Sequence, residues 1–251
     1  MPPIASDALV LRTYKLGETS KVVVLFTRDR GKLRAVAKGA RGARSRYQSA
    51  LEPLSEVRAT LYGRQGAELF RLGACELVRS AFPAAARGLE QSLALSYFAE
   101  LLDAFCAEGQ AEDDVYRLAV AVLAAAAADS SSVTVLARYL EAWLLRLHGI
   151  YPPLDRCAGC GRALAKGELR YHASARGFVC GLCGACSGPV LEPVARAFLE
   201  GAFRRAPAAM PSVLPAGAEA LEPFHQDLIT QHIERGLRSQ RVLRDVARET
   251  R

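Results

Sequence analysis

The sequence of 251 residues lacks the motifs that mark most nucleotide-dependent enzymes and hydrolases. It contains no G-x-x-x-x-G-K-[ST] loop for phosphates, no G-x-S-x-G elbow and no H-E-x-x-H pair. The four histidines, at positions 148, 172, 225 and 232, do not group with carboxylates by spacing. Nothing in the residue pattern argues for catalysis, so we expect a protein that is not an enzyme and takes no small-molecule substrate.

Long apolar runs are also missing. The longest uncharged apolar run, Leu118–Ala128, is too short and too rich in alanine to span a bilayer. The opening stretch, MPPIASDALVLR, has no basic region followed by a long apolar segment. The seven cysteines are odd in number, which disfavours a secreted disulfide scaffold. We therefore expect a cytoplasmic protein with no membrane partner.

Acidic residues are scarce in the first third of the chain. Residues 1–80 hold 15 Lys/Arg against 7 Asp/Glu, whereas residues 81–251 hold 18 against 19. The first third therefore carries the whole net charge of +7. A local positive field of this kind favours a polyanionic partner.

The positive charge is densest in GKLRAVAKGARGARSR, residues 31–46. Alternation places three cations on one face of a predicted strand, and three more follow in a glycine-bearing loop. Backbone phosphates suit such an array, which reads no base sequence. We predict that these six residues contact nucleic-acid phosphates: Lys32, Arg34, Lys38, Arg41, Arg44 and Arg46. Tyr14 and Tyr47 flank the patch and are candidates to stack on bases.

The hydrophobic pattern changes period near residue 80. Before it, alternating runs such as LSEVRATLY predict about five short strands, the strand number of an OB-fold barrel, although strand number alone does not exclude an SH3-like barrel. After it, helices are predicted around 93–105, over 112–128, from Ser132 to Leu147, over 190–204 and over 224–247. The predicted class is α+β, divided into a barrel (1–80), a first helical part (81–153), a cysteine-rich module (154–189) and a second helical part (190–251).

Five of the seven cysteines fall between residues 157 and 186. Cys157 and Cys160 form one C-x-x-C-G turn, and Cys180 and Cys183 form a second after nineteen intervening residues, which is typical of a zinc ribbon. We predict a structural Zn²⁺ held by these four thiolates, which leave no open position for substrate water. Cys186 is an alternative fourth ligand in place of Cys180, and a redox-active C-x-x-C is the other interpretation of the pairs.

Three stretches resemble the bacterial RecO family of recombination mediators. They are DALVLRTYKLGETSKVVVLFTRDRGKLRAVAKGARGARSR, LRLHGIYPPLDRCAGCG and HIERGLRSQRVL, and the likeness covers essentially the whole chain. The resemblance implies an OB-fold followed by a helical domain that carries a four-cysteine zinc module. It also implies binding to single- and double-stranded DNA, strand annealing, and partnership with RecR and with the acidic tail of single-stranded DNA-binding protein (SSB). Together these partners help the recombinase RecA load onto coated strands, with no enzymatic turnover implied.

An acidic tail that ends in apolar residues requires a hydrophobic pocket rimmed by cations. Five arginines of the helical region are rim candidates: Arg138, Arg146, Arg235, Arg238 and Arg241. Sequence does not choose among them. Three other functions stay open on the residues alone: an RNA-binding OB and zinc-ribbon protein, a metal-dependent enzyme, and a scaffold whose basic patch meets an acidic protein.

Overall fold

The structure is a computed structural model, and it describes residues 3–42, 45–64, 66–184, 188–233, 237 and 239. Internal contacts divide the chain into two compact units, one of Met1–Leu123 with Leu237–Arg251 and the other of Ala124–Gly236. The boundary falls within a helix, α3 (Asp113–Ala128). The four-part division expected from the sequence stays a prediction.

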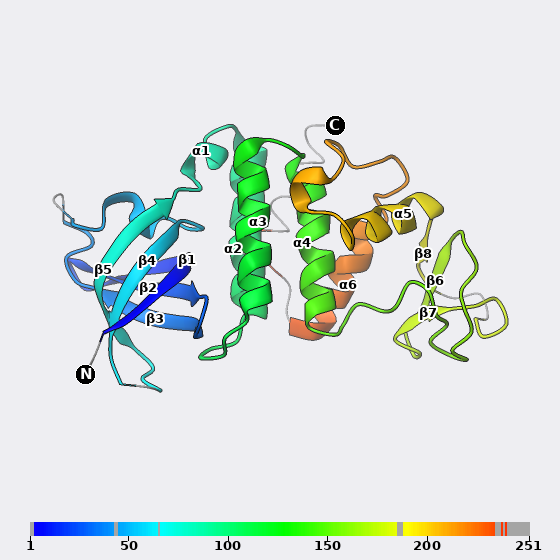
Figure 1. The fold of residues 1–251 in the computed structure, drawn as a ribbon, viewed down its shortest axis with the longest axis horizontal. Helices are drawn as coiled ribbons and strands as arrows, with labels where there is room; N and C mark the ends of the chain where they lie inside the picture. The colour runs from blue at the N-terminus through cyan, green and yellow to red at the C-terminus, as the bar shows by residue number, and fades with distance from the viewer. Residues whose placement is uncertain are drawn as a thin grey trace. The chain divides into compact units, whose positions relative to one another are not determined.

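The first unit begins with a closed five-stranded barrel in the order β1-β2-β3-β5-β4 (Figure 1). Its strands are β1 (Ile4–Leu16), β2 (Ser20–Thr27), β3 (Gly31–Ala37), β4 (Glu56–Tyr62) and β5 (Phe70–Arg79), with the short helix η1 (Gln48–Leu51) between β3 and β4. All pairings are antiparallel except the short parallel one between β3 and β5 that closes the barrel. This is the order of an OB-fold, so the predicted fold class is confirmed.

The barrel forms because its strands alternate between apolar and polar residues. On β4, Val57, Ala59 and Leu61 point inward and are completely buried, while Arg58 and Thr60 between them do not reach the core. Side chains from all five strands meet in one hydrophobic core. The outward face of β2 is also apolar, and Phe26 there is buried, because it packs on a helix as well as on the sheet.

Three helices follow the barrel: α1 (Phe82–Ala85), α2 (Leu89–Phe105) and α3 (Asp113–Ala128). Within the first unit, the ring of Phe26 lies 5.9 Å from that of Tyr116 on α3. Asp113 and Asp114 occupy the first turn of α3, where acidic side chains favour the helix dipole. Helices therefore cover the outer barrel face around Phe26.

The second unit contains α4 (Val133–Leu147), α5 (Pro193–Ala202), η2 (Pro207–Ala209) and α6 (Leu221–Ile233). Ser132 caps α4, as predicted, by accepting a hydrogen bond of 3.3 Å from the Val135 amide. Gly149 follows the helix with φ of +70°, and two prolines prevent its continuation. The predicted helix over 224–247 is α6 as far as Ile233, and most of the remainder lies outside the described residues.

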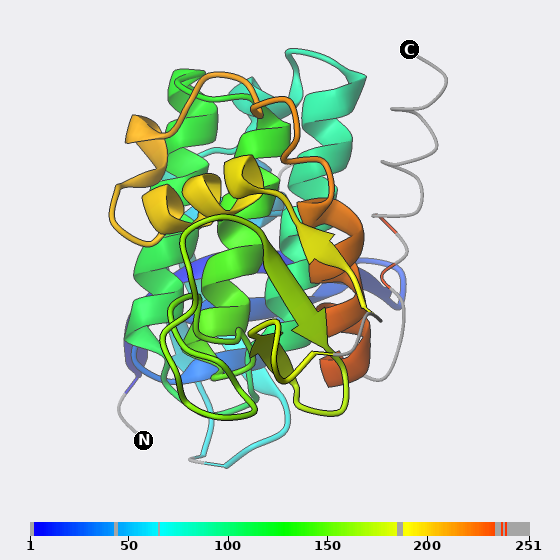
Figure 2. The same cartoon turned by 90° about the vertical axis from the view of Figure 1, so that its right-hand side faces the viewer.

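A three-stranded sheet in the order β7-β6-β8 belongs to the second unit. Its strands are β6 (Leu169–His172), β7 (Gly177–Val179) and β8 (Val190–Leu191). Figure 2 shows this small sheet toward the viewer, with α5 in yellow and α6 in orange beside it. In the described part of the chain, no helix is both long enough and apolar enough to cross a membrane.

Candidate nucleic-acid interface and metal centre

The predicted basic patch divides into two sets of residues with different surroundings. Lys32 lies on β3 near the end of α2, and only 14% of its side chain is exposed. Its Nζ lies 3.4 Å from a carboxylate oxygen of Asp103 and donates a hydrogen bond of 2.6 Å to the backbone carbonyl of the same residue. Asp103 is itself buried, so Lys32 attaches α2 to the barrel and is not available to a phosphate.

Other cations at this end of the strands are paired in the same way. Arg34 lies 2.5 Å from Glu108, and Arg28 lies 2.6 Å from Asp113. The backbone joins them as well, because the Lys32 amide donates to the carbonyl of Ala107 at 3.0 Å. Acidic residues that follow the barrel in sequence therefore neutralise this end of the predicted patch.

The cations beyond β3 are exposed. Lys38 and Arg41 have no ion pair with any residue that the structure describes. Arg41 fixes the loop to the β1–β2 turn, because its backbone amide donates to the Thr19 carbonyl at 2.9 Å and its guanidinium to the Gly17 carbonyl at 2.8 Å. The loop is therefore held where its charges can meet a ligand.

Two lysines that the sequence interpretation missed lie beside this loop. Lys15 pairs directly with Lys21 across the β1–β2 hairpin, and Lys21 pairs with Ala37, the neighbour of Lys38. Like charges directly opposite each other are destabilising unless an anion lies between them. The sequence alone does not show that these lysines are neighbours, because their pairing depends on the strand register. We call Lys15, Lys21, Lys38 and Arg41 the open basic end of the barrel.

Of the two remaining predicted cations, Arg44 and Arg46, the structure describes only Arg46. Arg46 is exposed, its guanidinium lies 4.9 Å from the ring centroid of Tyr47 and it donates to the Tyr47 hydroxyl at 2.8 Å. Arg44 lies outside the described residues. The suggestion that Tyr47 stacks on bases is wrong, because its ring is buried in the barrel core and its hydroxyl donates to the Leu72 carbonyl at 2.9 Å. Tyr14, by contrast, is 45% exposed.

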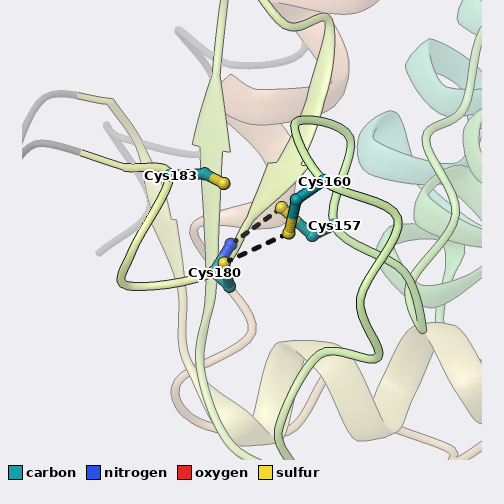
Figure 3. Close-up of side chains that lie close together, drawn as sticks. All are labelled: Cys157, Cys160, Cys180 and Cys183. Atoms are coloured by element: carbon teal, nitrogen blue, oxygen red, sulfur yellow. Dashed lines mark hydrogen bonds between the residues drawn. The ribbon is translucent and has the colours of Figure 1, made fainter.

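The four predicted zinc ligands converge (Figure 3). Cys157 and Cys160 precede β6, Cys180 and Cys183 follow β7, and their ligand atoms all lie within 4.8 Å of one another. The sulfurs of Cys160 and Cys180 are 3.8 Å apart. A tetrahedral zinc site with Zn–S bonds of about 2.3 Å has sulfurs roughly 3.8 Å apart, so the spacing suits such an ion.

Backbone amides surround the sulfurs. The Cys180 amide donates to Cys157 Sγ at 3.3 Å, and this bond, with those from the amides of Cys160 and Gly159 in the turn of Cys157 itself, lowers the pKa of Cys157 to about 6. The amide of Cys183 is the main cause that lowers the pKa of Cys180. The pKa of Cys183 is raised to about 12 by its hydrogen bonding to the sulfurs of Cys160 and Cys180. Four sulfurs this close together can all be ionised only with a cation between them, so the arrangement can bind a metal ion as the counter-charge.

Among the residues that the structure describes, Cys180 is the fourth member of the cluster. Cys186 lies outside the described residues. His172 lies 3.0 Å from the Ser174 hydroxyl through Nδ1 and is not a member of the cluster. Cys106 is the residue that ends α2 and is not a member of the cluster; it is buried, and this burial raises the pKa of its thiol well above the ordinary value.

A pocket of about 510 Å³ opens in the second unit. It is lined by Arg146, Tyr151, Pro152, Pro153, Leu154, Asp155, Glu200, Phe203 and Arg204. The Arg146 guanidinium lies over the ring of Phe203 at 4.4 Å and that of Trp143 at 5.4 Å, so its hydrogen-bonding edge remains for a ligand. The pocket therefore combines apolar side chains with two cations, Arg146 and Arg204, and two carboxylates, Asp155 and Glu200.

Of the five rim candidates, Arg146 alone among the described residues lines this pocket. Arg138 is not a rim residue, because it is buried and lies 2.8 Å from the buried Glu141. Arg235, Arg238 and Arg241 lie outside the described residues. Arg204 is a pocket cation that the sequence interpretation missed, since nothing in its neighbourhood marks it.

Comparison with known proteins adds a second line of observation. Residues 1–81 match the family model described as "Recombination protein O N terminal", and residues 87–241 match "Recombination protein O C terminal". The chain is 34% identical over 252 residues to a "DNA repair protein RecO" of Anaeromyxobacter dehalogenans (strain 2CP-C), covering 98% of each chain. It is 35% identical over 199 residues to the protein of that name from Koribacter versatilis (strain Ellin345), covering 79% of this chain and 80% of the relative.

Proposed function

Because this chain belongs to the RecO family of DNA repair proteins, we propose that it binds single- and double-stranded DNA and anneals complementary strands. With RecR it helps the recombinase RecA load onto single strands that SSB coats. The observation that best supports DNA binding is the open basic end: exposed or half-buried cations on an OB-type barrel, without carboxylate partners among the described residues.

The open basic end suits phosphates and not bases. Lys15, Lys21 and Lys38 come from three neighbouring strands or the loop beyond them, and Arg41 adds a planar guanidinium. Such cations bind the backbone of any sequence and lower the repulsion between two strands, which is what annealing requires. Tyr14, exposed on the same hairpin, offers a face on which a base can stack. Arg46 extends the proposed surface, and Arg44, which lies outside the described residues, stays a proposed contact on its sequence position alone.

The first test is the fluorescence anisotropy of labelled single-stranded DNA, titrated with the full chain at several salt concentrations. We expect affinity to fall linearly on a log–log plot, with little preference for sequence. An RNA competitor of the same length separates this function from the alternative of an RNA-binding protein, which would prefer the RNA. No binding even at low salt would overturn the proposal and favour the alternative of a scaffold whose basic patch meets an acidic protein.

The four-cysteine cluster holds zinc in this proposal. A set of four thiolates at tetrahedral spacing suits Zn²⁺ or iron, and zinc needs no redox partner. Four protein ligands fill the coordination sphere, which supports a structural role and a protein without turnover. Metal analysis of the purified chain tests this, and we expect one equivalent of zinc.

The pocket of the second unit is the proposed site for the acidic SSB tail. Tyr151, Leu154 and Phe203 would contact the apolar end of the tail, while Arg146 and Arg204 would meet its carboxylates. A labelled tail peptide should bind wild type, and Arg146→Gln should weaken it at least about tenfold, as expected for a desolvated charge partner. Arg162→Gln, an exposed arginine that does not line the pocket, is the control. Partnership with RecR and a cytoplasmic, nucleoid-associated location rest on the family alone.

A further inference from the structure

One wall of the pocket is part of the chain that leads into the metal cluster. Tyr151, Pro152, Pro153, Leu154 and Asp155 are consecutive lining residues, and Cys157 follows two positions later. The wall and the first metal ligand therefore share one short segment. A metal ion that fixes Cys157 therefore also restricts the positions of the pocket residues just before it.

Hydrogen bonds tie this wall to the cysteine-rich module. Arg196 on α5 is 8% exposed and donates to the carbonyls of Leu154 at 3.1 Å and of Ala165 at 2.5 Å. The Leu164 amide donates to the Asp155 carbonyl at 2.8 Å. The wall can therefore keep this geometry only while the loop that contains residues 164 and 165 stays folded against it.

Aromatic rings make a second connection between the module and the pocket. On the module, the rings of Tyr171 and Phe178 lie 5.2 and 5.6 Å from that of Phe224 on α6. The ring of Phe224 lies 6.1 Å from that of Tyr151, which in turn lies 5.5 Å from Phe203 at the pocket. Figure 2 shows the sheet that carries the first two rings next to α6. The packed rings run without a break from the metal-binding sheet to the pocket.

The Tyr151 ring is also fixed from behind. Its hydroxyl lies 2.9 Å from Nε2 of His225, whose Nδ1 lies 2.9 Å from a carboxylate oxygen of Glu141. Both of these residues are completely buried. The Tyr151 ring is thus held by α6, and Phe224, one of its ring partners there, loses its own contacts with Tyr171 and Phe178 if the module loosens.

We propose that the metal ion and the acidic peptide stabilise the same folded form of the module, so that each raises the affinity of the protein for the other. The proposal rests on the proposed function of the pocket as an acidic-peptide site. The two-state element is the module itself, because a ribbon this small depends on its metal to fold. Coupling through a shared state is reciprocal: the factor by which metal strengthens peptide binding equals the factor by which peptide strengthens metal binding.

The experiment uses the full chain loaded with one equivalent of Zn²⁺ and a labelled acidic peptide that ends in phenylalanine. Stripping the metal with a chelator should weaken peptide binding at least about fivefold, and Zn²⁺ should restore it. Equilibrium competition for zinc with a colorimetric chelator should shift by the same factor when the peptide saturates the protein. Unchanged affinity in both arms overturns the coupling and leaves the pocket assignment intact, whereas no peptide binding to the loaded protein overturns both.

Two matched variants remove the remaining ambiguity, which is that stripping could unfold the whole unit. Arg196→Gln keeps all four cysteines and should retain one zinc, yet weaken the peptide at least about threefold because the wall is released. Arg176→Gln, at an exposed turn of the same module, should change neither. At the peptide concentration that just saturates wild type, Arg146→Gln should reduce the effect of the peptide on zinc competition in step with its weaker peptide binding. A full shift in this variant at that concentration would show that the peptide acts elsewhere and overturn the proposal.

Discussion

The division of the basic residues can be tested by removing two charges from each end of the barrel strands. Lys15→Gln with Lys38→Gln removes two cations of the open basic end, whereas Arg28→Gln with Arg34→Gln removes two that pair with Asp113 and Glu108. Both double variants lower the net charge equally. All four side chains are exposed, so each variant should fold.

The expected magnitude follows from counting phosphate contacts. A single strand contributes a slope of about −0.7 per neutralised phosphate to log K against log salt, so the four cations of the open basic end give about −2.8. Affinity should then fall about 50-fold between 50 and 200 mM salt for wild type. The first variant should show a slope of about −1.4 and a loss of only about sevenfold over the same range.

The assay is fluorescence anisotropy with one labelled single strand, repeated at four or more salt concentrations for each protein. The second variant should keep a slope close to that of wild type, because its arginines are already neutralised by carboxylates. Equal loss of slope in the two variants would refute the reasoning, since only net charge would then matter. A larger loss in the second variant would place the DNA on the helix-covered end.

Three further predictions concern the metal and the buried charges. Cys160→Ser should lower zinc content from one equivalent to well below one, measured by metal analysis, because one of the four convergent sulfurs is lost. Asp103→Asn should cost about 3 kcal/mol of unfolding free energy in urea, because Lys32 is left nearly buried without its counter-charge; a cost under 1 kcal/mol would mean that the pair is dispensable. Burial lowers the pKa of His225 below its ordinary value of 6.5, so as the pH falls the unfolded chain binds a proton at this histidine before the folded chain does. The melting temperature should therefore be constant above about pH 6.5 and fall as the pH drops below it.

Local sequence was sufficient for several elements and for the cysteine cluster. Alternation in LSEVRATLY and the Ser132 cap depend on neighbours a few residues away, so β4 and the start of α4 were predictable. The cysteine pairs were predictable for the same reason, because each C-x-x-C turn presents two sulfurs by its own geometry and the spacing between pairs allows them to meet. Family membership also follows from the sequence, since matched residues extend along nearly the whole chain.

Tertiary structure decided which charges remain available. Lys32 and Lys38 look alike in the sequence, but α2 brings a buried carboxylate to the first and nothing described to the second. Lys15 lies near Lys38 only because of the strand register. Arg138 and Arg146 are both on α4, but Arg138 pairs with the buried Glu141 whereas Arg146 lines a pocket. Composition and spacing determine which residue types are present and which local turns they form. Partners distant in sequence determine whether a charge is neutralised or free to bind, because an ion pair depends on distance in space.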